Sequence, residues 1–248
     1  MLLSRWSIVP AVFSVTLLAA CSAEAPAPAP AETTASRGGA AEMPVMGPEV
    51  RILAFGDSLF AGYNVASEDS YPAKLEAALR ASGVNARVSN AGVSGDTTAA
   101  GLQRLAFTLD AQSEKPDLFI LELGGNDLLR GIQPEQTRQN IDTMLAELQK
   151  REIPVLLMGM RAPPNFGEFQ ADFDALYPEL ARQYGAELVP FFLDSIYTKP
   201  ELIQDDRVHP TAEGIETLVG ATVGAVKLAL PEKPSGPEKP AGPEKPAG

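Results

Sequence analysis

The 248-residue chain contains one cysteine, Cys21, and one histidine, His209. A single cysteine excludes an intrachain disulfide. A single histidine excludes a metal site built from several imidazoles, and it leaves His209 as the one imidazole available for general base catalysis. Any catalytic chemistry that uses an imidazole in this chain therefore depends on His209.

Basic residues are also scarce. The chain has 20 lysines and arginines against 32 aspartates and glutamates, which gives a formal net charge of −12. Nucleic-acid binding needs a basic surface to neutralise phosphates, and electrostatic docking on anionic lipid needs the same. The composition therefore argues against nucleic acid as a partner and against an electrostatic membrane contact.

Residues 1–20 have the pattern of a secretory signal, with Arg5 before an apolar segment too short to span a membrane comfortably. The segment Leu18-Ala19-Ala20-Cys21-Ser22 resembles the lipobox of bacterial lipoproteins. That resemblance implies cleavage before Cys21, lipidation of its thiol and anchoring in the bacterial cell envelope, with Ser22 pointing to the outer membrane. The alternative is an ordinary signal peptide with small residues at its cleavage site.

The flanks differ from the middle of the chain in composition. Residues 21–48 are rich in alanine and proline, and residues 231–248 repeat the pattern Pro-Glu-Lys-Pro-x-Gly. Neither segment has enough apolar surface to form a core, so we expect a disordered linker and a disordered tail. The range 49–230 is left as one domain with a single core.

Strand-like and helix-like patterns alternate along this domain, and several strand candidates are continuous apolar runs. The expected strands are 50–55, 87–90, 117–123, 154–159 and 187–190. The expected helices are 71–81, 97–109, 134–150, 172–184 and 211–228. This rhythm predicts an α/β fold with a mainly parallel sheet and helices on both faces.

Polar blocks follow the expected strands at the edge where open α/β sheets place their ligand sites. Ser58, in Gly56-Asp57-Ser58, offers a nucleophilic hydroxyl. His209 offers the base that such a hydroxyl requires, and Asp206, three residues earlier, is placed to orient its ring.

Other polar blocks offer donors for a developing oxyanion. Gly92, in the block 90–97, is expected to present its backbone N–H. Asn126, in Gly124-Gly125-Asn126-Asp127, is expected to present its side-chain amide. The backbone N–H of Ser58 would be a third donor. Each block alone has a plain structural explanation, such as a helix cap or a turn. Together, and in this order, the blocks predict acyl transfer.

The four blocks, at residues 56–59, 90–97, 124–127 and 206–210, resemble those of the SGNH (GDSL) hydrolases, and the likeness runs over roughly residues 51–226. Segments 122–131, 159–167 and 204–210 are similar to the branch that holds periplasmic acyl-CoA thioesterase/lysophospholipase and related arylesterases. The resemblance implies a flavodoxin-like three-layer α/β/α sandwich with strand order 2-1-3-4-5. It also implies a mobile loop at 128–134 beside the acyl pocket. A lipid anchor at Cys21 would depart from this soluble branch.

The resemblance further implies roles for the site residues and a substrate class. Ser58 would be the nucleophile, His209 the base and Asp206 its orienting acid. Ser58, Gly92 and Asn126 would form the oxyanion hole. The expected reaction is hydrolysis of fatty-acyl esters or thioesters, such as aryl esters, acyl-CoA or lysophospholipids, by a monomer that needs no metal or cofactor.

Apolar side chains near the expected site are candidates for an acyl groove, although core packing explains each of them equally well when taken singly. These candidates are Leu128, Leu129, Ile132 and Phe166. Arg130 and Arg161 either attract a phosphate or stay in solvent. Two other functions remain open at this point, a polysaccharide O-deacetylase and a catalytically silent lipoprotein binding module.

Overall fold

The computed structural model describes residues 45–231. The predicted signal sequence, Cys21, most of the predicted linker and residues 232–248 of the predicted tail lie outside this range. Within residues 45–231, no helix is long and apolar enough to cross a membrane.

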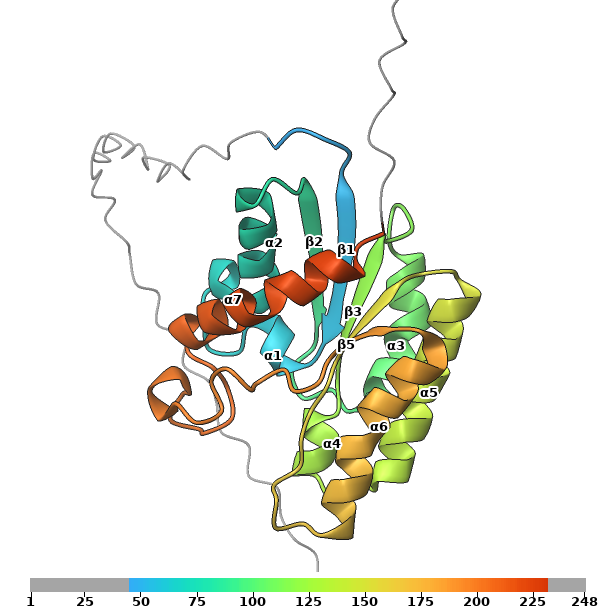
Figure 1. Cartoon of the computed structure of the whole chain (residues 1–248), viewed down its shortest axis with the longest axis vertical. Helices are drawn as coiled ribbons and strands as arrows, with labels where there is room; N and C mark the ends of the chain where they lie inside the picture. Colours follow the sequence, from blue (N-terminus) through green and yellow to red (C-terminus); the bar gives the residue numbers. More distant parts are fainter. Residues whose placement is uncertain (1–44, 232–248) are drawn as a thin grey trace, which may run out of the picture. The chain divides into compact units, whose positions relative to one another are not determined.

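The centre of the domain is a five-stranded parallel sheet with the order β2-β1-β3-β4-β5 (Figure 1). This order and the parallel pairing confirm the predicted fold. The strands are β1 (Val50–Gly56), β2 (Ala86–Gly92), β3 (Leu118–Glu122), β4 (Val155–Met158) and β5 (Glu187–Val189).

The central strands are buried along almost their whole length because helices cover both faces of the sheet. Every residue of β3 is buried, and so is every residue of β1 except Arg51. The register pairs Gly56, at the end of β1, with Gly92 of β2 and Glu122 of β3. The polar blocks that follow these strands therefore begin at the same edge of the sheet.

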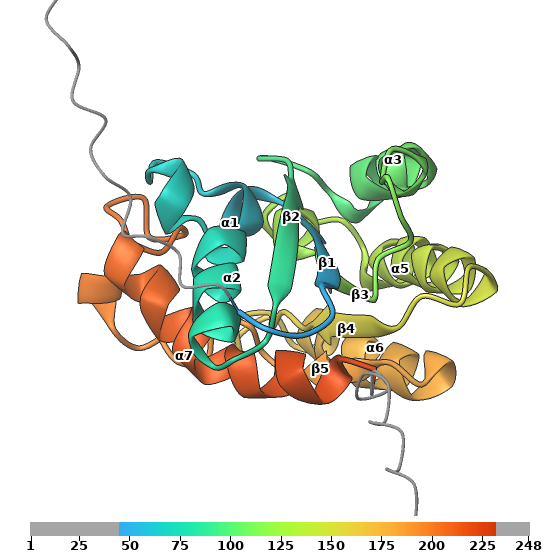
Figure 2. The ribbon, with the colours of Figure 1, turned by 90° about the horizontal axis from the view of Figure 1, so that it is seen from above.

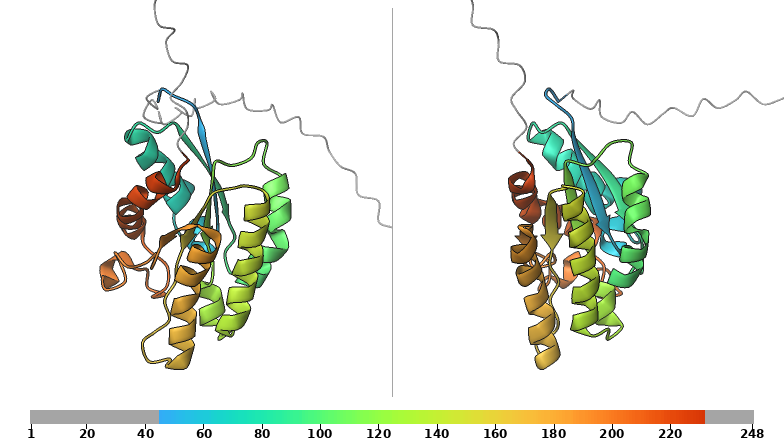
Figure 3. Two further views of the ribbon diagram at one scale, coloured as in Figure 1. Left: turned by 45° about the vertical axis from the view of Figure 1, so that its right-hand side comes forward. Right: turned by 90° about the vertical axis from the view of Figure 1, so that its right-hand side faces the viewer.

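Helices α2 and α7 cover one face of the sheet, and α3, α5 and α6 cover the other (Figures 2 and 3). The larger helices are α2 (Tyr71–Ala81), α3 (Thr98–Asp110), α5 (Pro134–Lys150), α6 (Glu168–Tyr184) and α7 (Ala212–Ala229). The predicted ranges of α2 and α5 are confirmed, whereas α6 begins earlier than predicted. The shorter elements are α1 (Ser58–Ala61), α4 (Gly125–Leu129) and the 3₁₀ turns η1 (Ser67–Asp69) and η2 (Pro200–Leu202).

Buried hydrogen bonds hold the helices in place around the functional edge. The carboxylate of Asp127 in α4 is fully buried and accepts a hydrogen bond from the Thr98 N–H at 2.8 Å and from the Thr137 hydroxyl at 3.1 Å. These bonds join α4 to α3 and α5. On the opposite face, the hydroxyls of Tyr71 and Thr222 lie 2.7 Å apart and join α2 to α7.

The two ends of the described domain lie at the same edge of the sheet. β1 begins at Val50 and runs toward Ser58, so Val50 marks the edge away from the polar blocks (Figure 1). Helix α7 runs back toward the edge where β1 begins and ends at Ala229 (Figure 1).

Candidate active site

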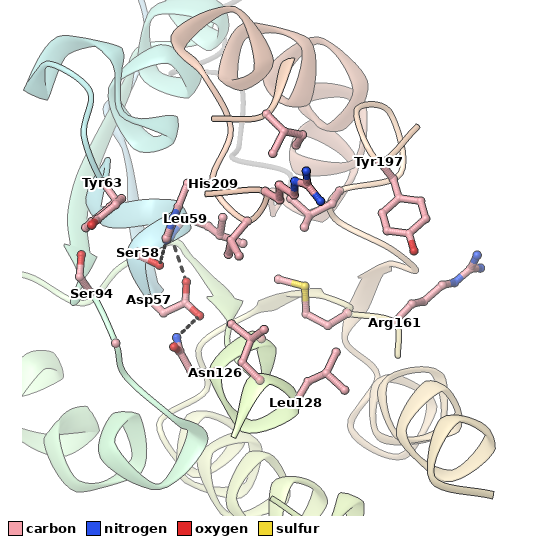
Figure 4. Close-up of a pocket in the computed structure, with 18 of the residues that line it drawn as sticks. Asp57, Ser58, Leu59, Tyr63, Ser94, Asn126, Leu128, Arg161, Tyr197 and His209 are labelled. Atoms are coloured by element: carbon pink, nitrogen blue, oxygen red, sulfur yellow. Dashed lines mark hydrogen bonds between the residues drawn. The ribbon is translucent and has the colours of Figure 1, made fainter. Parts of the chain in front are cut away.

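The position of Ser58 follows from the end of β1. The chain leaves the strand at Gly56 and enters the short helix α1, of which Ser58 is the first residue. Asp57 caps this helix, because its Oδ1 accepts the Leu59 N–H at 3.0 Å. The Ser58 side chain is thereby held at the carboxyl edge of the sheet, facing the cavity in Figure 4.

Three side chains that are distant in sequence form a hydrogen-bonded chain at this edge. The Ser58 Oγ lies 2.8 Å from His209 Nε2, and His209 Nδ1 lies 2.6 Å from Asp206 Oδ2. The second oxygen of Asp206 accepts the backbone N–H groups of Val208 at 2.9 Å and His209 at 3.0 Å. The structure brings together the predicted nucleophile, base and orienting acid.

The same contacts keep Asp206 ionised. Partial burial disfavours its charge, but the hydrogen bonds from His209 and Val208 outweigh burial and lower the pKa of the carboxyl to about 2. A carboxylate held in this form fixes the Nδ1–H tautomer of His209, which leaves Nε2 free to accept the Ser58 proton.

Tyr63 is a neighbour of the imidazole that the sequence did not predict. Its ring lies on that of His209, with centroids 4.3 Å apart and planes 32° apart. The backbone of Tyr63 is tied to the His209 loop by Gln204, whose Nε2 donates to the Tyr63 carbonyl at 3.0 Å and to the Pro210 carbonyl at 2.8 Å. These bonds hold the stacked pair together.

Two of the predicted oxyanion donors, the Ser58 N–H and the Asn126 side-chain amide, belong to residues that line the cavity. The Ser58 N–H, in the first turn of α1, has no acceptor among the described residues. Asn126 Nδ2 donates to Asp57 Oδ2 at 2.9 Å, which leaves its second N–H for a ligand (Figure 4).

The third predicted donor, Gly92, does not fit this role. Its N–H donates to Asn90 Oδ1 at 2.9 Å, and Gly92 does not line the cavity. The glycine is needed there for another reason, since a Cβ on Gly92 would lie 2.3 Å from the backbone nitrogen of Ala61. Gly95 lines the cavity instead, with φ +86° and an N–H that forms no hydrogen bond within the described residues.

A cavity of about 500 Å³ extends from Ser58 and His209 toward Tyr197 and Arg161 (Figure 4). Most of its lining is apolar, and much of it comes from loops that follow β4 and β5. The apolar lining side chains are Leu59, Leu128, Leu129, Met160, Pro163, Phe191, Leu193, Ile203 and Val208.

The cavity includes two of the four residues that were expected to line an acyl groove. Leu128 and Leu129 line it, whereas Ile132 and Phe166 do not. The Ile132 N–H donates to the Asp127 carbonyl at 2.9 Å, in the turn that follows α4. The ring of Phe166 packs edge-on against that of Phe169, with the ring centroids 5.9 Å apart.

The two predicted phosphate contacts also differ in position. Arg130 Nη2 donates to the Gly95 carbonyl at 2.7 Å and so joins α4 to the loop after β2. Arg161 lines the far part of the cavity, with its guanidinium 5.5 Å from the ring centre of Phe191. No group of three metal-ligating side chains occurs within residues 45–231.

The chain is similar to known hydrolases over most of the described domain. Residues 54–216 match the model of the GDSL-like lipase/acylhydrolase family. The chain is 42% identical over 164 residues to an arylesterase of Vibrio mimicus, covering 66% of this chain and 81% of that relative. It is 39% identical over 163 residues to thioesterase 1/protease 1/lysophospholipase L1 of Escherichia coli strain K12, covering 65% and 76% respectively.

Solved structures give the same result. AlinE4, described as an SGNH-hydrolase family esterase, is 64% identical, with a TM-score of 0.64 over 75% of this chain and 99% of that one. TesA is 36% identical, with a TM-score of 0.68 over 73% and 99%. The matched family range includes Ser58, Asn126, Asp206 and His209.

Proposed function

Because this chain belongs to the GDSL-like lipase/acylhydrolase family and is a serine esterase of the SGNH type, we propose that Ser58 is its nucleophile, with His209 as general base. Asp206 orients and charge-stabilises the imidazole. The observation that carries this assignment is the continuous chain of hydrogen bonds Asp206–His209–Ser58, with distances of 2.6 and 2.8 Å.

The geometry supports a two-step acyl transfer. His209 Nε2 takes the Ser58 proton as Oγ attacks the substrate carbonyl, and the N–H groups of Ser58, Gly95 and Asn126 receive the oxyanion. When the ester or thioester bond breaks, the imidazolium returns the proton to the leaving oxygen or sulfur. Water, deprotonated by His209, then hydrolyses the acyl-enzyme and releases the acid.

The cavity favours fatty-acyl substrates over acetyl esters. An acetyl group would fill only the part next to Ser58, whereas a longer chain would cover Leu128, Met160 and Leu193 and bury apolar surface against them. Aryl esters, acyl-CoA and lysophospholipids, which the names of the relatives suggest, share this acyl part. Movement of the segment 128–134 beside the cavity stays a prediction.

The assignment is tested with the full chain and p-nitrophenyl esters of acetate, butyrate, octanoate and palmitate. Ser58→Ala is expected to abolish turnover, while Ser82→Ala is the matched control, because the Ser82 hydroxyl only caps the far end of α2 by donating to the Leu79 carbonyl. Full activity of Ser58→Ala would overturn the assignment. Turnover confined to the acetyl ester would keep the mechanism and move the substrate toward O-acetylated polysaccharides.

We also propose that Cys21 carries lipid and anchors a monomeric enzyme in the bacterial envelope. The support is the lipobox-like sequence 18–22 and the position of the only cysteine within it. Cys21→Ala should move the protein from the membrane fraction to the soluble fraction, while activity per molecule on p-nitrophenyl butyrate stays unchanged. Membrane fractionation of the variant like that of wild type would contradict the anchor.

A further inference from the structure

A buried carboxyl group with no role in the triad lies directly beneath the nucleophile. Glu122 ends β3 and is fully buried. Its Oε2 accepts the Asp57 N–H at 3.2 Å, but its Oε1 is buried without any hydrogen-bond donor. An ionised carboxylate with a bare oxygen in such a site would be uncompensated, so the structure requires another explanation for Oε1.

The neighbour of Glu122 is a second carboxyl group. Both residues are buried, and the Asp57 N–H donates to Glu122 Oε2 at 3.2 Å, which places the two acidic residues next to each other. Two buried carboxyl groups this close do not both ionise, so one of them carries a proton. Asp57 has outside donors, from the Leu59 N–H at 3.0 Å and Asn126 Nδ2 at 2.9 Å, whereas the side chain of Glu122 has only the Asp57 N–H.

Glu122 has fewer donors than Asp57, so the proton belongs on Glu122, and an O–H at Oε1 would account for the lack of a donor to that oxygen. Burial, and then the charge of Asp57, raise the pKa of Glu122 well above its usual value, in agreement with this geometry. No ion pair or hydrogen bond within residues 45–231 joins Glu122 to a basic side chain. The nearby Tyr71 and Tyr177 are neutral and bond elsewhere, to Thr222 and to the Leu123 carbonyl.

The surroundings fix the position of the acid. A Cβ on Gly56 would lie 2.6 Å from Glu122 Oε2 and 2.8 Å from the Glu122 carbonyl oxygen, so β1 and the Glu122 side chain are in close contact. Asp57 is the next residue of the same chain segment. Asp57 thus contacts Glu122 through its backbone N–H and Asn126 through its carboxylate, which accepts the Asn126 amide at 2.9 Å.

We propose that Glu122 is a positioning residue that acts as a permanently protonated acid: its O–H orients the Asp57 carboxylate, and Asp57 aims the Asn126 amide at the oxyanion. One N–H of the Asn126 amide is held by the hydrogen bond to Asp57, and the other N–H stays available for the substrate oxyanion. This inference rests on the proposed role of Asn126 as an oxyanion donor. It adds that Asp57 and Glu122 hold Asn126 in position.

The first test compares two replacements of Glu122 by steady-state kinetics on p-nitrophenyl butyrate. Glu122→Gln keeps an N–H donor for Asp57 and an oxygen for the Asp57 N–H, so kcat should stay within about threefold of wild type. Glu122→Leu removes the donor and should lower kcat about 100-fold with little change in KM, as loss of an oxyanion donor does. Equal kcat for the Leu variant and wild type would overturn the proposal, as would a 100-fold loss in the Gln variant.

A double-mutant cycle separates positioning from general loss of structure. If Glu122 acts through Asn126, the variant Glu122→Leu/Asn126→Ala should be no slower than Asn126→Ala alone. Losses that multiply would mean that Glu122 does not act through Asn126. Thermal unfolding of each variant shows which of them retain the fold and enter the cycle.

The protonation state has its own readout, which needs neither activity nor a folded Leu variant. The infrared difference spectrum between wild type and Glu122→Gln at pH 8 should show the C=O stretch of a protonated carboxylic acid in wild type. Absence of this band would overturn the proposal even if the esterase mechanism stands. Conversely, an active Ser58→Ala variant would overturn the proposed mechanism and leave the infrared result unaffected.

Discussion

The ring of Tyr63 lies on the imidazole of His209, with the two centroids 4.3 Å apart. When His209 takes the proton of Ser58 it becomes a cation, and the face of an aromatic ring attracts a cation. The stack is thus stronger in the transition state than in the resting enzyme, which is the condition for an effect on kcat.

A replacement that removes the Tyr63 ring should therefore slow turnover, whereas a replacement that keeps an aromatic ring should not. Tyr63→Leu is expected to lower kcat about 2- to 5-fold, because an exposed cation–π contact contributes about 0.5–1 kcal/mol. Tyr63→Phe keeps the ring and is the matched control, with kcat near wild type. Steady-state kinetics on p-nitrophenyl acetate measure this effect, and a Leu variant as fast as the Phe variant would show that the stack has no catalytic role.

Asp206 should remain ionised over the whole working range of the enzyme. Since the pKa of its carboxyl is about 2, loss of activity between pH 4 and 6 is not due to Asp206. Asp206→Asn removes the negative charge beside His209 and can place an amide N–H against Nδ1, which favours the wrong imidazole tautomer. We therefore expect kcat to fall by at least about 100-fold at pH 8. Full activity of the Asn variant would mean that another group orients His209.

The same carboxylate should stabilise the fold in a defined pH window. Its pKa is lowered from 3.8 to about 2 in the folded chain, so its contribution is present above pH 3.8 and is lost as the pH falls through about 2. The difference in unfolding free energy between wild type and Asp206→Asn should shrink across this interval. Urea unfolding at several pH values measures it, and a constant difference would contradict the lowered pKa.

Glu122 should have the opposite pH dependence. A raised pKa means that the folded chain binds a proton that the unfolded chain releases, so stability falls as pH rises above the unfolded value near 4.5. Glu122→Gln cannot titrate and should gain stability relative to wild type between pH 5 and 8, by at most about 1.4 kcal/mol per pH unit. A difference that does not change with pH would show that Glu122 is ionised in the folded chain.

The length of the cavity should set the preferred acyl chain. Leu193→Trp adds volume to the lining, so kcat/KM for the octanoate and palmitate esters should fall about 10-fold or more, while the acetate ester is unaffected. Leu228→Trp is the control, because Leu228 is 80% exposed and outside the cavity. An equal loss on all esters would mean that Leu193 supports the fold rather than the acyl chain.

Long elements could be predicted from the sequence because their patterns repeat. Helices α2 and α5 each have apolar residues on one face over three or more turns, and β3 is a continuous apolar run. The short helices α1 and α4 have too few residues to show a period. They occur where polar blocks leave the sheet, so the sequence located the site without predicting its local structure.

Details of the site that depend on close approach could not be predicted from the sequence. Gly92 and Gly95 lie in one block, and their roles can be told apart only in the structure. Gly92 allows β2 to pack closely against α1, whereas Gly95 lines the cavity. Ile132 and Phe166 were expected near the acyl chain because of their place in sequence, but the turn after α4 and packing on Phe169 direct them elsewhere. Sequence distance says little about which side of a loop a residue faces.

The edge where β1 begins and α7 ends has a practical consequence. Val50 and Ala229 lie at one end of the sheet and Ser58 at the other (Figure 1). A bead, electrode or fusion partner joined directly to Val50 or to Ala229 would thus be attached at the end of the sheet opposite the cavity. Enzyme immobilised through either of these two residues is expected to keep the cavity open to bulk substrate.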